Sequence, residues 1–153
     1  MFTKDFDRYV CEGDTIECEV DGFTLTATVY RDETGDSPEE HDEGFWPSLD
    51  PKSAGYIGPK SKSTLARHMA RAKAIMEAWR NDEWFYCGVA VAASKDGVQL
   101  TKRYDHALWG LECNWPVKNI SRENPNTYLR EVANEYVSEA LEAAKATVAK
   151  LAA

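Results

Sequence analysis

The chain has 153 residues, of which 43% are apolar and 29% are charged, and its net charge is −8. These values are typical of one folded domain and exclude a disordered chain. No run of about 18 apolar residues is present, which excludes a membrane-spanning helix. The first nine residues lack the apolar core of a signal peptide, which predicts a protein of the cytoplasm. In that compartment Cys11, Cys18, Cys87 and Cys113 are expected to be thiols.

The first strong structural signal is Asp21-Gly22, which separates two segments of alternating polarity, 15–20 and 23–31. Asp-Gly favours the positive φ angles of a two-residue hairpin turn. If Val20 pairs with Phe23, one face of the hairpin is apolar throughout and the other carries glutamates and threonines. A shift of one residue would expose every apolar side chain, so the sequence predicts this register.

A long connection follows at residues 32–60, with neither helical nor strand periodicity. It contains four of the six prolines, and connections of this length are either functional or disordered. Its first part holds seven carboxylates and no lysine or arginine: Asp32, Glu33, Asp36, Glu39, Glu40, Asp42 and Glu43. Phe45 and Trp46 come next. Since aromatic residues are rare in disordered segments, residues 44–58 are expected to be packed.

The remaining sequence predicts a helix, three strands and a second helix. The first helix begins at Ser61 or Ser63 and ends near residue 81. The strands are expected at 84–93, 98–104 and 107–114, and the last helix from 124–126 to 151. The first of these strands is apolar at both parities, which is typical of an interior strand. The predicted fold is α+β in a single domain of residues 1–153. It has an antiparallel sheet of about five strands, in the order ββ, loop, α, βββ, α, with two helices packed on it.

The residues that would support catalysis are sparse. His106 follows Asp105 in a tight connection and is expected to be solvated at a hairpin tip. Cys87 lies in the apolar strand, where burial raises the pKa of a thiol and makes it unreactive. No ligand spacing for a metal and no glycine-rich phosphate loop is present, so neither a metal nor a cofactor is predicted. Arg67 and Arg71 of the first helix are expected to neutralise the acidic connection. The sequence therefore favours a binding role over an enzymatic one.

Four segments of the second half resemble a group of small proteins encoded by tailed phages and prophages: 79–84 (WRNDEW), 88–91 (GVAV), 108–112 (LWGLE) and 128–135 (YLREVANE). The similar block covers residues 79–141. The group has no assigned activity, so the resemblance transfers no catalytic residue. It implies a bacterial cytoplasm as the setting, and it favours an antagonist of host machinery.

The charge is distributed unevenly along the chain. Residues 1–60 hold 15 acidic and 5 basic residues, a charge of −10, whereas residues 61–153 hold 11 and 13, a charge of +2. The negative electrostatic potential of residues 1–60 is expected to repel nucleic acid and to attract basic surfaces. The sequence predicts an acidic interaction protein that antagonises or modulates a host protein of nucleic-acid handling or defence. The acidic and aromatic residues of the connection, together with Glu17 and Glu19, would contact a basic surface of that protein without direct binding to nucleic acid or membrane.

Two other functions stay open. One is a small-molecule-binding protein or enzyme, with a pocket between residues 44–60 and the sheet, near Trp84, Trp109 and the helix start at 61–64. The other is a component of the virion or of its assembly. The last helix has a wide apolar face rich in alanine, which also predicts a homodimer through this C-terminal helix.

Overall fold

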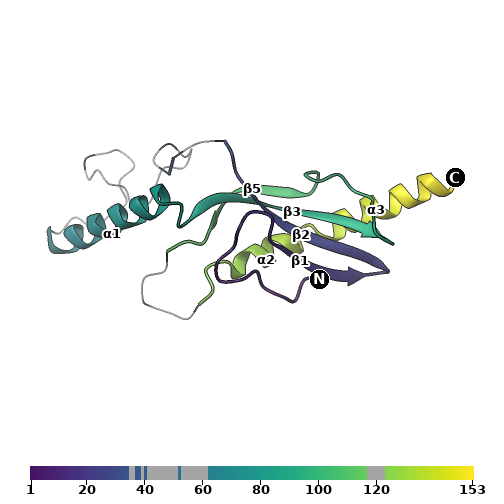
Figure 1. The fold of residues 1–153 in the computed structure, drawn as a ribbon, viewed down its shortest axis with the longest axis horizontal. Coiled ribbons are helices and arrows are strands. Elements are labelled where there is room, and N and C mark those ends of the chain that lie inside the picture. Colours follow the sequence, from purple (N-terminus) through teal and green to yellow (C-terminus); the bar gives the residue numbers. More distant parts are fainter. Residues whose placement is uncertain (35–36, 39, 41–51, 53–61, 117–122) are drawn as a thin grey trace. The chain divides into compact units, whose positions relative to one another are not determined.

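The computed structural model describes residues 1–34, 37–38, 40, 52, 62–116 and 123–153 (Figure 1). Two compact units make up the chain: Met1–Asp32 with Phe85–Ala153, and Glu33–Trp84. The expected α+β class is confirmed, with five antiparallel strands in one sheet within the described ranges. Among the helices in these ranges, none combines the length and the apolar character that crossing a bilayer requires.

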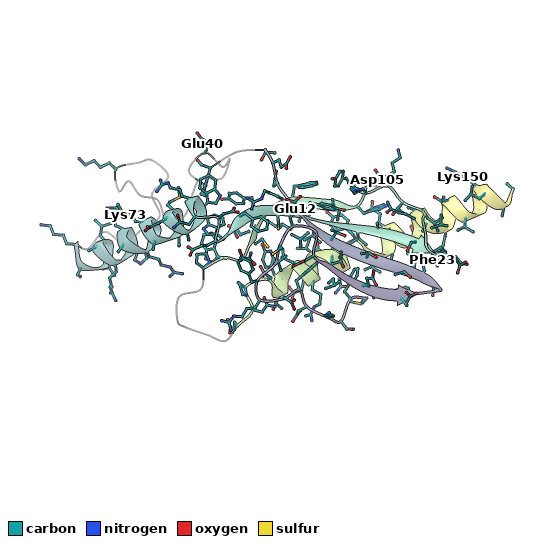
Figure 2. All side chains as sticks on the ribbon, viewed as in Figure 1. Glu12, Phe23, Glu40, Lys73, Asp105 and Lys150 are labelled. Carbon is teal, nitrogen blue, oxygen red and sulfur yellow. The ribbon has the colours of Figure 1, made fainter. Side chains whose placement is uncertain are left out.

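The predicted hairpin is confirmed in both extent and register. Strand β1 (Thr15–Val20) pairs with β2 (Phe23–Arg31), with Val20 opposite Phe23. The turn residues Asp21 and Gly22 have φ angles of 52° and 77°, as a tight turn of this kind requires. Phe23 lies at the tip of this hairpin and is buried there (Figure 2).

Strand β3 (Phe85–Lys95) is the interior strand that its sequence predicts. It pairs with β2 on one side and with β4 (Val98–Gln99) and β5 (Ala107–Cys113) on the other. The prediction of a strand at 98–104 is wrong in length, because only Val98 and Gln99 pair with β3. Thr101 is buried and its hydroxyl accepts the Ala93 N–H at 2.9 Å, so a side chain takes the place of a backbone carbonyl there.

Two helices, α2 (Thr127–Glu135) and α3 (Val137–Ala152), pack against one face of the sheet (Figure 1). The prediction of one continuous terminal helix is wrong, since the helix divides at Tyr136. Tyr136 has φ −97° and ψ −3°, and its N–H bonds to the Ala133 carbonyl at 3.1 Å in a tight final turn. Its side chain packs against the core. Small side chains bring α3 close to the sheet: Ala140 and Ala144 are fully buried.

The N-terminal segment completes this core, although no helix or strand is predicted for it from the sequence. Phe2, Phe6 and Val10 are buried at intervals of four residues. Asparagine side chains hold their backbone. Asn114 bonds to both the N–H and the carbonyl of Val10 at 2.8 Å, and Asn134 does the same for Phe2 at 2.7 and 3.2 Å.

The second unit contains α1 (Lys62–Arg80), whose extent agrees with the predicted helix. Trp84 closes this unit. Its side chain is fully buried, and its indole N–H donates to the Ile75 carbonyl at 2.9 Å.

Candidate functional site

The face of the sheet opposite α2 and α3 is called the polar face below. Its side chains come from alternate positions of the strands: Thr15, Glu17, Glu19, Thr24, Thr26, Thr28, Tyr30, Ala92 and Ser94, with Trp109 from β5. The predicted pairing of glutamates with threonines is confirmed. Thr24 donates its hydroxyl to Glu19 at 2.5 Å, and Thr26 donates to Glu17 at 3.4 Å.

Glu17 and Glu19 differ from Asp5 and Asp21 of the same unit, whose charges are balanced by ion pairs. Asp5 forms an ion pair with Arg130 at 2.9 Å, and Asp21 forms one with Lys145 at 2.7 Å. Within the described part of the chain, Glu17 and Glu19 have threonine partners only, and no ion pair. A neutral hydroxyl fixes a carboxylate without cancelling its charge, so the polar face keeps two negative charges at defined positions.

An aromatic cluster of Tyr30, Tyr104 and Trp109 lies on the same face. The ring centroids of Tyr30 and Tyr104 are 5.1 Å apart, and those of Tyr104 and Trp109 are 5.7 Å apart, both in edge-on geometry. Tyr104 is 52% exposed and Trp109 is 40% exposed. Rigid aromatic side chains of this kind are frequent anchors of protein interfaces, because they bury much area at low cost in conformational entropy.

Two glycines place Trp109 against the sheet. Strand β5 has one extra residue opposite Gly88, and Gly110 takes a φ of 75° there. The bulge turns the Trp109 ring onto Gly88. A Cβ atom at position 88 would lie 2.6 Å from Cδ2 and 2.7 Å from Cζ3 of Trp109. Only a glycine leaves room for the ring in this position.

Asp32, the first of the predicted partner-binding carboxylates, lies at this bulge. Its Oδ2 accepts the Gly110 N–H at 3.1 Å, and its own N–H donates to the Tyr86 carbonyl at 2.9 Å. Its carboxylate therefore holds β5 against the end of β2.

Of the other predicted partner-binding residues, only Glu33 and Glu40 lie in the described part of the chain. Glu33 is exposed, and Glu40 accepts the Ser37 N–H at 3.3 Å within a turn of the second unit. The rest of the predicted set lies outside the described residues: Asp36, Glu39, Asp42, Glu43, Phe45 and Trp46. The same applies to the alternative pocket, because residues 44–60 are outside the described ranges except Lys52.

Replacing Asp32 with alanine is expected to lower the free energy of unfolding by about 2 kcal/mol, because the Gly110 N–H loses a charged acceptor. Urea unfolding of the full chain measures this effect. Glu33→Ala is the matched control: Glu33 is exposed, so its replacement should change stability by less than about 0.5 kcal/mol. Equal effects of the two substitutions would contradict the assigned role of Asp32.

A shallow cavity of about 200 Å³ lies beside the aromatic cluster on the polar face. Its lining includes Thr26, Thr28, Tyr30, Ser94, Gln99 and Arg103. The Arg103 guanidinium stands 5.9 Å from the Tyr104 ring centroid, and side-chain hydrogen bonding to Tyr104 raises the pKa of Arg103. The face thus combines hydroxyl groups, one cation and exposed rings.

The prediction for His106 is wrong. His106 is only 7% exposed, and its carbonyl accepts the Val91 N–H at 2.8 Å, so the residue is bonded to β3 and does not lie at a free hairpin tip. Its Nδ1 lies 3.9 Å from Glu139 of α3. Cys87 is buried as expected; a hydrogen bond with Cys113 and desolvation raise the pKa of its thiol. All four cysteines are free thiols. The described residues contain no group of three side chains suited to a metal ion.

Burial raises the pKa of Tyr86 from 10.0 to about 12, and the nearby Glu112 carboxylate adds to the shift. The folded protein therefore holds this phenol proton after the unfolded chain has lost it. Tyr86 stabilises the fold fully below pH 10, and this contribution is expected to be lost as the pH rises toward 12. The difference in phenolate absorbance between wild type and Tyr86→Phe should titrate near pH 12 when folded and near pH 10 in urea. A folded midpoint at 10 would contradict the burial of this hydroxyl.

Comparison with known proteins finds no match to a family model, a curated protein or a solved structure. The candidate site consequently rests on its own geometry. Sequence reasoning placed Glu17 and Glu19 correctly and named Trp109 only as part of the alternative pocket. It missed Tyr30 and Tyr104 altogether. The one signal for their cluster was Gly88, a glycine inside an apolar strand, which often marks a close approach of another group.

Proposed function

We propose that this chain is a phage-derived interaction protein without catalytic activity, which binds a basic surface of a host protein involved in nucleic-acid handling or defence. The observation that supports it most is the polar face. Two carboxylates without a cationic partner in the described residues lie on the same sheet face as exposed aromatic rings. Carboxylates steer and orient a basic partner, and aromatic side chains supply the contact area. The resemblance of residues 79–141 to phage proteins supports the phage origin.

The test is affinity capture from a lysate of the bacterium that carries the gene, with the full chain immobilised. Wild type should retain a partner at about 0.05 M salt and release it at about 0.5 M, since the attraction is screened. Glu17→Lys with Glu19→Lys should reduce retention of that protein at least tenfold. Trp109→Ala should weaken it independently of salt.

The matched control reverses two exposed carboxylates on the helices, with Glu135→Lys and Glu142→Lys. It makes the same change in net charge away from the polar face and should leave retention unchanged. If the control abolishes capture as strongly as the polar-face variant, only net charge matters, and the proposed surface is wrong.

A further inference from the structure

Among the residues that the structure describes, β1 is the terminal strand of the sheet, so one of its edges has no neighbouring strand there. Val20 and Phe23 flank the two-residue turn, and in such a hairpin the N–H and the carbonyl of each of these residues bond to the other. Hydrogen-bonded and non-hydrogen-bonded positions alternate along the strand. The N–H and carbonyl groups of Thr15, Glu17 and Glu19 therefore point away from β2. These three residues are exposed, and within the described residues no other strand bonds to this edge. The edge thus offers three N–H groups and three carbonyls in an extended row.

The charges along this edge restrict what can pair with it. Residues 4–19 hold six carboxylates and only two basic residues. A second copy of β1 would bring Glu17 and Glu19 beside the same carboxylates of its partner, which disfavours self-pairing. A strand with lysine or arginine at alternate positions would instead place cations beside Glu17 and Glu19.

A cavity of about 290 Å³ lies where β1 begins. Its lining includes Lys4, Asp5, Phe6, Asp7, Asp14 and Thr15. Asp14 is fixed there, because its Oδ2 accepts the Cys11 N–H at 2.9 Å. The volume is at the small end of the range for ligand sites, so it suits a single long side chain. Asp5 is paired with Arg130, but Asp7 and Asp14 outnumber Lys4 in the lining, which favours a basic side chain.

We propose that the partner supplies an extended segment, with lysine or arginine at alternate positions, that adds to β1 as a further strand of the sheet. Its backbone bonds to the outward groups of Thr15, Glu17 and Glu19. Its basic side chains lie beside the two glutamates, and one of them enters the cavity next to Asp14. This inference rests on the proposed function and adds the mode of binding.

The probe is a capped nine-residue peptide that alternates lysine with valine, titrated into the full chain. Backbone amide exchange should slow at Thr15, Glu17 and Glu19 when the peptide is bound. Two peptides of the same charge, N-methylated at either set of alternate residues, are the matched controls. One of them should bind at least tenfold more weakly, because its methyl groups occupy the edge that faces β1, and the other should bind like the parent. Equal affinity of all three peptides, or no binding at about 1 mM peptide, overturns the proposal.

Two protein variants distinguish the contribution of the β1 backbone to peptide binding from that of the two carboxylates. Thr15→Pro removes one outward N–H and keeps both carboxylates; proline is tolerated at the first residue of an edge strand. Glu17→Gln with Glu19→Gln keeps the edge and removes the charge. Both variants should bind the peptide at least threefold more weakly than wild type, whereas Glu135→Gln with Glu142→Gln should bind it like wild type. If the peptide does not bind while host-protein capture still depends on Glu17, Glu19 and Trp109, strand addition is wrong and the proposed function stands. If the peptide does not bind and capture does not depend on these residues, both proposals are wrong.

Discussion

Asn126→Ala is expected to lower the free energy of unfolding by more than about 3 kcal/mol, although it removes only one small polar side chain. Asn126 is fully buried. Its Oδ1 accepts the Asn114 N–H at 2.8 Å, and its Nδ2 donates to the Asp7 and Arg8 carbonyls and to Asn114 Oδ1. Alanine removes the acceptor of the Asn114 N–H and also the donor to the Asp7 and Arg8 carbonyls, and each buried group that loses its partner costs about 1–3 kcal/mol.

Urea unfolding measures this loss, and hydrogen exchange shows its location. The amides of Val10 and Asn114 should lose protection first, since both depend on the asparagine network. Asn81→Ala is the control: Asn81 is exposed, and the change should alter stability by less than about 0.5 kcal/mol. A loss below about 1 kcal/mol for Asn126→Ala would show that the network does not hold the N-terminal segment.

Gly88→Ala is expected to cost about 2–3 kcal/mol, because the new methyl group occupies the space of the Trp109 ring. In a Trp109→Ala background the same change should cost less than about 1 kcal/mol. The difference, a coupling energy of about 1–2 kcal/mol, is the evidence for direct contact. The Trp109→Ala background also corrects for the general preference of strands for alanine over glycine.

Gly88→Ala also tests the candidate site. If the ring is displaced from the sheet, capture of the host partner should fall to the level of Trp109→Ala, while Glu17 and Glu19 keep their positions. Additive costs of the two substitutions, with capture unchanged, would contradict the view that Gly88 positions the ring for binding.

The hairpin shows which parts of the fold the sequence predicts well. Its turn residues, Asp21 and Gly22, are adjacent in sequence, and the alternating pattern permits a single register. Both signals are local. The interior position of β3 was also predicted from a local signal, because apolar residues at both parities indicate a strand covered on both faces.

The remaining features depend on contacts between residues far apart in the sequence. The Asn114–Val10 bonds join positions 104 residues apart, and no local pattern indicates which asparagine is buried. The break at Tyr136 contains neither glycine nor proline, so the helical pattern continues through it. His106 was expected to be solvated because a hairpin tip usually is, but its carbonyl bonds to Val91 of β3 and its side chain is buried.

The candidate site was predictable only in part. Glu17 and Glu19 follow from strand alternation, since their face is set by the register of the hairpin. The aromatic cluster requires the extra residue in β5 and the pairing of Gly88 with Tyr30, which are tertiary features. The inward orientation of Asp32 likewise depends on a strand that begins 75 residues later in the sequence.

The fastening of residues 2–10 by Asn114, Asn126 and Asn134 has a consequence for biosynthesis. Residues 2–10 are synthesised before the side chains that hold them, which follow more than a hundred residues later in the chain. Phe2, Phe6 and Val10 therefore remain without their final surroundings until residues 114–134 have emerged from the ribosome. Residues 2–10 are thus made early but are among the last of this unit to reach their native positions.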